Sequence, residues 1–296
     1  MKLLRLFPIA IFAVAIQGCN NTPDSSLTQP ASSQAQVLIT KPRLVSAQSE
    51  LAIARLTEIL TRAEITEEQR AKLMYDRGVV YDSVGLRSLA HYDFQRALKL
   101  QPDLVDGYNF LGINFTQRQQ FLQAYDAFDT AIELDPDHDY AYLNRGIALY
   151  YGRRPEQALA DLQRFQLDEQ QDPYRIAWLY LVERDIDPVK AKQSLREHFK
   201  QLQHDNWANN ILALLLEDIN QQQFLSTISV GVSDHNQLLD RLCEAYFYLG
   251  KYHQYQGNIE TSQDYFRLAL TTNVYEFVEY RFAELELALH EKEMTP

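Results

Sequence analysis

Basic residues are scarce in this sequence of 296 residues. There are 28 Lys and Arg against 40 Asp and Glu, so the formal net charge is −12 at pH 7. Nucleic acids and anionic lipid headgroups attract proteins mainly through clusters of positive charge. The composition therefore argues against both as binding partners.

Recognisable catalytic and cofactor motifs are also missing. The sequence contains no phosphate-binding loop, no zinc-type spacing of Cys and His, and no Gly-x-Ser-x-Gly. Residues 135–139, Asp-Pro-Asp-His-Asp, are metal-ligand types, but Asp and Pro are equally typical of turns and helix caps. We therefore predict a protein that is not an enzyme, with no catalytic residue, no metal site and no cofactor.

Only two cysteines are present, Cys19 and Cys243. Lys2 and Arg5 accompany an apolar run over residues 3–16, which is typical of a secretion signal. The run ends in Ile-Gln-Gly-Cys, which resembles the lipobox of bacterial lipoproteins. Residues 1–18 are thus predicted to be a lipoprotein signal peptide, with a plain cleaved signal or a membrane anchor as alternatives.

Acylation of Cys19 would attach the protein to a membrane through lipid rather than through charge. Loss of Lys2 and Arg5 with the signal peptide changes the net charge to −14. Asn20 follows the cysteine where an inner-membrane lipoprotein usually has Asp, so we expect the periplasmic face of the outer membrane. Cys243 then has no intramolecular disulfide partner, and we expect it to be a buried thiol.

One pattern occurs twice in residues 71–136, spaced 34 residues apart. With Ala71 as position 1, positions 4, 7, 8, 11, 20, 24, 27 and 32 are Met74, Arg77, Gly78, Tyr81, Ala90, Phe94, Ala97 and Pro102. In the second copy, which starts at Val105, they are Tyr108, Leu111, Gly112, Phe115, Ala124, Phe128, Ala131 and Pro136. This pattern resembles the tetratricopeptide repeat, a helix-turn-helix unit in which small residues allow two helices to approach closely.

The pattern continues beyond these two copies. A third copy starts at Asp139 and another at Cys243, whereas residues 173–231 are helical in character but keep no 34-residue frame. That irregular region is either a set of degenerate units or a change in the direction of the superhelix. We predict an all-α tetratricopeptide-repeat solenoid with N- and C-terminal flanking helices. Its segments are the signal peptide (1–18), a flexible tether (19–48), an N-terminal helix (49–65), three repeats (66–172), irregular helical repeats (173–234), and a C-terminal repeat with a capping helix (235–290).

The first helix of each repeat is expected to line a concave groove. The residues predicted to form a partner-binding groove are Tyr75, Val79, Asp82, Asn109, Ile113, Tyr140, Asn144, Ile147 and Tyr151. Rings and amides of this kind suit an apolar or neutral polypeptide segment. Alternatively, some of these rings pack between neighbouring repeats.

The helix before the first repeat is amphipathic. Leu51, Leu56 and Ile59 lie on its apolar side. Such a helix either caps the solenoid or pairs with a second subunit, and we predict that these three residues contribute to a dimer interface.

Several runs resemble a specific family, the NlpI tetratricopeptide-repeat lipoproteins of bacterial envelopes. They are residues 74–103, 143–152 (LNRGIALYYG), 247–252 (FYLGKY) and 277–281 (FVEYR). The resemblance implies a homodimeric outer-membrane adaptor that binds peptidoglycan hydrolases, including a murein endopeptidase, and a Prc-like periplasmic protease. It would thereby regulate endopeptidase level, cell-wall growth and division. The alternative is a structural lipoprotein that acts as a scaffold for other envelope machinery.

Overall fold

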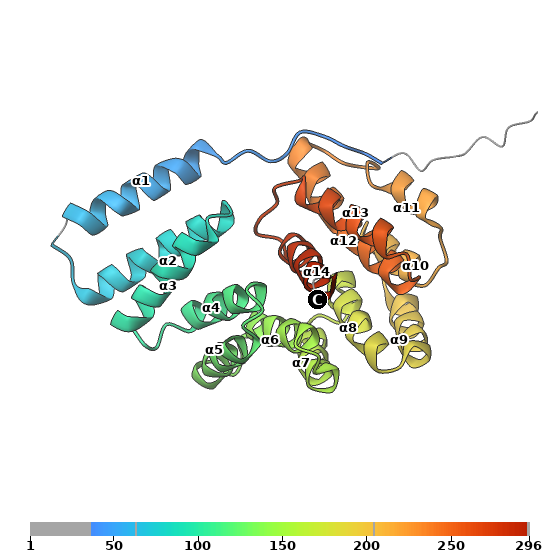
Figure 1. Ribbon diagram of the computed structural model, residues 1–296, viewed down its shortest axis with the longest axis horizontal. Coiled ribbons are helices and arrows are strands. Elements are labelled where there is room, and N and C mark those ends of the chain that lie inside the picture. The colour runs from blue at the N-terminus through green and yellow to red at the C-terminus, as the bar shows by residue number, and fades with distance from the viewer. Residues whose placement is uncertain (1–36, 63, 204, 295–296) are drawn as a thin grey trace, which may run out of the picture. The chain divides into compact units, whose positions relative to one another are not determined.

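The computed structural model describes residues 37–62, 64–203 and 205–294 (Figure 1). The predicted signal peptide and Cys19 lie outside the described residues. Within the described part there are α-helices and no strands, as predicted. The helices are α1 (Ala47–Arg62), α2 (Glu67–Ser83), α3 (Arg87–Leu100), α4 (Val105–Gln117), α5 (Phe121–Leu134), α6 (Asp139–Tyr151), α7 (Pro155–Asp168), α8 (Pro173–Ile186), α9 (Pro188–Gln201), α10 (Asn209–Leu215), α11 (Gln221–Thr227), α12 (His235–Tyr255), α13 (Ile259–Leu270) and α14 (Val278–Met294).

The repeats predicted from the 34-residue period are the helix pairs α2–α3, α4–α5, α6–α7 and α12–α13. In each pair the glycine of the first helix faces a large side chain of the second. A Cβ atom added at Gly112 would lie 2.5 Å from the ring of Phe128, and one at Gly250 would lie 2.4 Å from the ring of Phe266. Glycine is therefore required for the close approach of the two helices. In the third repeat Leu162 takes the place of the Phe ring, and a Cβ atom added at Gly146 would lie 2.9 Å from the Leu162 side chain.

The irregular region consists of two further helix pairs. Helices α8 and α9 form a close pair separated only by Asp187, whose carboxylate accepts hydrogen bonds from the backbone N–H groups of Val189 and Lys190. Helices α10 and α11 are short, with seven residues each. The region thus consists of helix pairs that keep no 34-residue frame.

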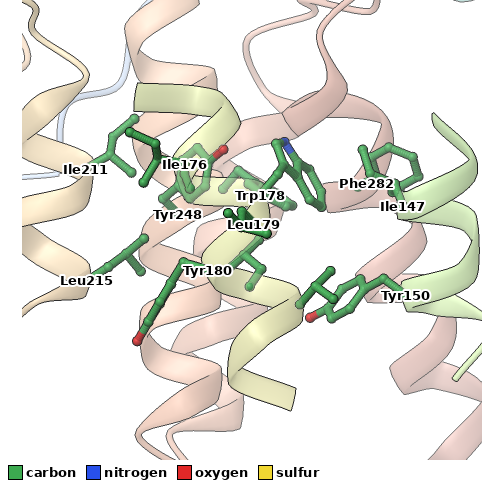
Figure 2. Close-up of a cluster of buried hydrophobic side chains, with 14 of the residues drawn as sticks. Ile147, Tyr150, Ile176, Trp178, Leu179, Tyr180, Ile211, Leu215, Tyr248 and Phe282 are labelled. Atoms are coloured by element: carbon green, nitrogen blue, oxygen red, sulfur yellow. The ribbon is translucent and has the colours of Figure 1, made fainter. Parts of the chain in front are cut away.

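Helix α8 lies at the centre of the largest hydrophobic core. Its residues Ile176, Trp178 and Leu179 are at most 3% exposed. Figure 2 shows α8 between residues of α6 on one side and Ile211 and Leu215 of α10 on the other. Since α12 and α14 also contribute to this core, the C-terminal helices pack against the middle of the chain rather than only against their sequence neighbours.

Part of the predicted tether is in contact with the C-terminal repeat. The backbone N–H of Arg43 donates to the carbonyl of Thr272 at 2.9 Å, and its guanidinium donates to Asp240 at 2.7 Å. The hydroxyl of Tyr246 donates to the carbonyl of Leu38. Residues 38–43 therefore belong to the folded part, and the boundary predicted at residue 48 is too late.

Helix α1 packs on α2 and leaves apolar side chains uncovered. Its residue Leu60 is buried, and Arg70 of α2 donates to the Leu60 carbonyl at 2.9 Å. Leu51 is 49% exposed and Ile59 is 40% exposed, while Leu56 is half-buried. These exposures leave the three residues accessible, and their place in a dimer interface stays a prediction.

Candidate partner-binding surface

The predicted groove residues differ widely in exposure. Asp82, Asn109, Ile113, Asn144, Ile147 and Tyr151 are each at most 7% exposed. Tyr75 and Val79 are half-buried, and Tyr140 is 61% exposed. The prediction of an open groove is therefore wrong at six of its nine positions.

Helix α14 is one reason for this burial. It is the dark red helix in the interior of Figure 1, and it contacts α4, α12 and α13. The Arg281 guanidinium donates to the carboxylate of Asp82 at 2.5 Å, and the two side chains are only 9% and 3% exposed. Arg87 also pairs with Glu284. The chain thus uses its own C-terminal helix to cover part of the concave surface of the first repeats.

Tyr151 is covered in the same way. Its ring stacks on that of Phe282 with the centroids 5.2 Å apart, and its hydroxyl donates to Glu286 at 2.9 Å. Glu286 also accepts from Lys251 of α12 at 2.7 Å. Burial alone lowers the pKa of Lys251, but Glu286 and neighbouring groups outweigh it, so the net shift is upward and the ammonium form is favoured.

Asn109 and Asn144 are joined to each other rather than aimed at a partner. The side-chain amide of Asn144 donates to the side-chain oxygen of Asn109 at 3.0 Å. Because both amides are buried, this bond satisfies polar groups that would otherwise be costly inside the protein. The two asparagines therefore connect repeats two and three and are not available for partner recognition.

An open cavity remains next to Tyr140. It has a volume of about 380 Å³ and lies where α6, α7 and α8 meet α12 and the start of α14. Its aromatic lining residues are Tyr140, Phe165, Tyr174, Trp178 and Phe277. Leu143 lies beside them. We call this space the acidic cavity because of its charged residues.

Five carboxylates line the acidic cavity: Glu169, Asp172, Glu244, Glu276 and Glu279. Glu244 and Glu279 are 8% and 6% exposed. Burial raises the pKa of Glu279 to about 7. Burial, and then the charge of Glu279, raise the pKa of Glu244. Because these two acids oppose each other's ionisation, a cation between them would stabilise their charged forms.

Arg175 is the one basic residue in the lining of the acidic cavity. Its guanidinium lies 3.8 Å from the centroid of the Phe165 ring and donates to the Phe165 carbonyl. Its other charged neighbours, Asp139, Glu169 and Asp172, are 3.6 to 3.8 Å away. Even with Glu244 and Glu279 protonated, three further lining carboxylates face this one cation, so the cavity has an excess of negative charge.

Aromatic rings and carboxylates together form a site for a cationic side chain. The rings attract a positive charge through their negative faces, and the carboxylates attract it directly. The volume falls within the range of roughly 300–1,000 Å³ typical of ligand pockets. A Lys or Arg side chain on an extended polypeptide has the size and charge that fit this cavity.

The residue types that suggested chemistry in the sequence, in residues 135–139 and at Cys243, have structural roles in the described part of the chain. No group of three or more His, Cys, Asp or Glu side chains among them has the geometry to hold a metal ion. In the segment 135–139, His138 caps α6 by accepting from the backbone N–H of Ala141 at 3.1 Å. The Cys243 thiol is fully buried, and burial raises its pKa, so it is not an activated nucleophile.

Sequence reasoning missed the acidic residues of the cavity. Glu244 belongs to α12, the first helix of the C-terminal repeat, but the predicted groove included only residues of the first three repeats. Glu279 belongs to the start of α14, outside the repeats. A weak signal was available, because Glu244 follows Cys243 in an otherwise apolar segment of a repeat. Its meaning became clear only from the position of α14.

Helices long and apolar enough to cross a bilayer are absent from the part of the chain that the structure describes. Lipid attachment through Cys19 remains a prediction, since that residue lies outside this part.

No family model matches the sequence. Among solved structures, a tetratricopeptide repeat protein from Parabacteroides merdae is 13% identical, and the match covers 82% of this chain and 100% of that one with a TM-score of 0.51. YrrB, described as a tetratricopeptide-repeat protein with an unusual peptide-binding site, is 16% identical over 85% of this chain and 100% of its own, with a TM-score of 0.39. PilF of Pseudomonas aeruginosa is 14% identical over 80% of this chain and 97% of its own, with a TM-score of 0.40. The first likeness, together with the helix pairs described above, shows that this chain has the tetratricopeptide-repeat fold.

Proposed function

We propose that this tetratricopeptide-repeat protein is a lipid-anchored adaptor on the periplasmic face of the outer membrane. The fold itself suggests a protein-interaction scaffold. In the proposal, its clients are a murein endopeptidase, other peptidoglycan hydrolases and a Prc-like protease, and the acidic cavity receives a basic side chain from one of them.

One observation carries this proposal. Three of the four segments that resemble the NlpI family, residues 143–152, 247–252 and 277–281, are far apart in the sequence but meet in space. Leu143 and Glu279 line the same acidic cavity, and Lys251 joins Tyr150 of the first segment through a hydrogen bond of 2.9 Å. Three of the four segments that carry the resemblance are thus close together, and two of them contribute residues to the lining of the acidic cavity.

An adaptor acts by bringing its clients together. Two proteins held on one surface meet at a local concentration of roughly millimolar order, so neither contact has to be tight. The hydrolase and the protease would supply the catalysis, and the adaptor would change how long the hydrolase persists.

A pull-down from solubilised envelope tests this function. The bait is the protein without residues 1–19, as wild type, as Tyr140→Ala and as Tyr92→Ala. Tyr92 is a matched control because it is 55% exposed on α3, outside the acidic cavity. We expect mass spectrometry to find a murein endopeptidase and a periplasmic protease with wild type and Tyr92→Ala, and less of at least one with Tyr140→Ala.

The other outcomes separate the parts of the proposal. Equal capture by all three baits would keep the adaptor and reject the acidic cavity as its client site. Capture of neither enzyme would favour a structural scaffold for other envelope machinery. Cleavage of peptidoglycan or casein by the purified protein, at a rate that further purification does not reduce, would contradict a role without catalysis.

A further inference from the structure

A second cavity lies at the other end of α8. It has a volume of about 430 Å³ and lies between the α8–α9 pair and the ends of α10 and α12. Tyr174 lines the acidic cavity and Arg184 lines this one. The two residues are ten positions apart on one helix, which corresponds to about 15 Å. The two cavities are thus separate sites.

One wall of the second cavity is apolar. Tyr180 and Leu215 are 5% and 4% exposed and form its floor, and the half-buried Tyr252 and Tyr255 flank them. Val189 lies at the rim and is 67% exposed. A large apolar side chain entering here would cover surface that is now in contact with water.

The charge of this cavity is opposite to that of the acidic cavity. Its charged lining residues are Arg184, Lys192, Arg196 and Glu217. The carboxylate of Glu217 is already bound, because one oxygen accepts from Lys192 at 2.5 Å and the other from Gln256 at 2.7 Å. Arg196 is paired with Asp218 at 2.9 and 3.2 Å.

Arg184 is left with unused hydrogen-bonding capacity. Its guanidinium lies over the Tyr255 ring, 3.7 Å from the centroid, and it contacts the Tyr180 hydroxyl. Among the residues that the structure describes, no carboxylate oxygen of Asp or Glu lies within 4.0 Å of a guanidinium nitrogen of Arg184, the limit for an ion pair. The stacking fixes the plane of the guanidinium, while its N–H groups along the edge can still donate.

We propose that this second cavity binds an acidic side chain that is next to a large apolar residue in a partner polypeptide. The carboxylate would accept two N–H bonds from the edge of Arg184, which is the geometry that a guanidinium favours. The apolar neighbour would lie against Tyr252, Leu215 and Val189. Positive charge at this site stands out because the whole chain carries a net charge of −12.

This inference goes beyond the proposed function, because it requires neither of the clients named above and does not use the acidic cavity. It gives the protein two unlike sites on opposite ends of α8, one for a basic side chain and one for an acidic side chain. Two segments of different charge could then be bound at the same time.

Calorimetric titration with short peptides tests the proposal. The probes are hexapeptides acetylated at the N-terminus and amidated at the C-terminus, in which Leu, Phe, Tyr or Trp precedes a single Glu, each with a matched peptide that has Gln instead. We expect at least one Glu peptide to bind the protein without residues 1–19 about tenfold or more tightly than its Gln counterpart, since a charge-assisted bond is lost.

Variants assign that preference to the cavity. Arg184→Gln should abolish the preference for Glu while leaving helicity and thermal unfolding unchanged. Val189→Asp should weaken binding through repulsion at the rim, whereas Val230→Asp should not, because Val230 is equally exposed at 67% but lies outside the cavity.

Several results would overturn the proposal. They are equal affinity for Glu and Gln peptides, a preference that persists in Arg184→Gln, and no heat from any peptide at millimolar concentration. A Gln peptide with a free C-terminal carboxylate is added as a further probe; if it alone bound, the proposal would also be overturned, because the site would then recognise a chain end instead. None of these results depends on whether the hydrolase or the protease is a client.

Discussion

Replacement of Lys251 by Met should destabilise the protein strongly. Lys251 is 2% exposed, and its ammonium group donates to Glu286 at 2.7 Å, Gln254 at 2.7 Å and the Tyr150 hydroxyl at 2.9 Å. Met keeps most of the apolar length of the side chain but removes the charge. Glu286, only 7% exposed, would then be a buried carboxylate that has lost the ammonium group it contacts at 2.7 Å.

The magnitude follows from that uncompensated charge. Removing one partner of a buried ion pair typically costs about 3–5 kcal/mol. The remaining bonds to Glu286, from Tyr151 at 2.9 Å and Gln254 at 2.9 Å, do not replace the lost charge. Against a total stability of roughly 5–15 kcal/mol for a folded protein, this would be a large fraction.

Urea unfolding followed by circular dichroism measures the effect, and hydrogen exchange shows where it acts. The free energy of unfolding of Lys251→Met should fall by about 3–5 kcal/mol, and amide protection should fall first in α14. Lys292→Met is the control, because Lys292 is exposed and its ammonium group donates to Gln119 across the surface.

The double variant Lys251→Met, Glu286→Leu provides the decisive comparison. It removes both charges, so its loss of stability should be smaller than the sum of the two single losses by at least about 1 kcal/mol. If Lys251→Met lost no more stability than Lys292→Met, or if the two single losses were additive, the argument that this buried pair fastens α14 would be refuted.

Three further predictions concern packing, pH and assembly. Gly250→Ala should lower the free energy of unfolding in urea by about 1–3 kcal/mol, because the added Cβ would lie 2.4 Å from the Phe266 ring. An increase in the urea midpoint would contradict this packing. Stability should fall as pH rises from about 4.5 to about 7, because folded Glu279 keeps a proton that the unfolded chain releases. Glu279→Gln should reduce this loss of stability by on the order of 3 kcal/mol. If the variant had the same pH profile in unfolding experiments as wild type, Glu279 would be excluded as the source of the pH dependence. Leu51→Asp with Ile59→Asp should give a monomer in light scattering if α1 forms the dimer interface; a variant that stays dimeric would place the interface elsewhere.

The periodic features of the fold could be predicted from the sequence alone. The spacing of 16 residues between Gly78 and Phe94 recurs between Gly112 and Phe128 and between Gly250 and Phe266, and in all three pairs the ring packs on the glycine. These contacts join neighbouring helices of one unit, so the chain between them is short and the local pattern determines their geometry. For the same reason the capping box of α2, in which Thr66 accepts from the backbone N–H of Gln69 at 3.2 Å, could be predicted from its residues.

The accessible surface could not be predicted in this way. Whether Asp82 or Tyr151 faces a partner depends on α14, which begins at Val278 and is separated from both by more than 100 residues. The repeat pattern identified the concave positions but contained no information about what would cover them. A groove assignment from position alone therefore included six residues that the fold buries.

Local sequence thus determined the helices, their pairing and the close contacts within each unit, because these depend on propensity and on side chains a fixed, short distance apart along the chain. Tertiary structure decided which surfaces remain open, which carboxylates are brought together and which cation lines an open cavity. Glu244 and Glu279 line one cavity, and Arg184 lies in another against the ring of Tyr255, only because helices distant in sequence pack side by side. Burial and charge at these sites arise from that packing, and no pattern along the chain specifies it.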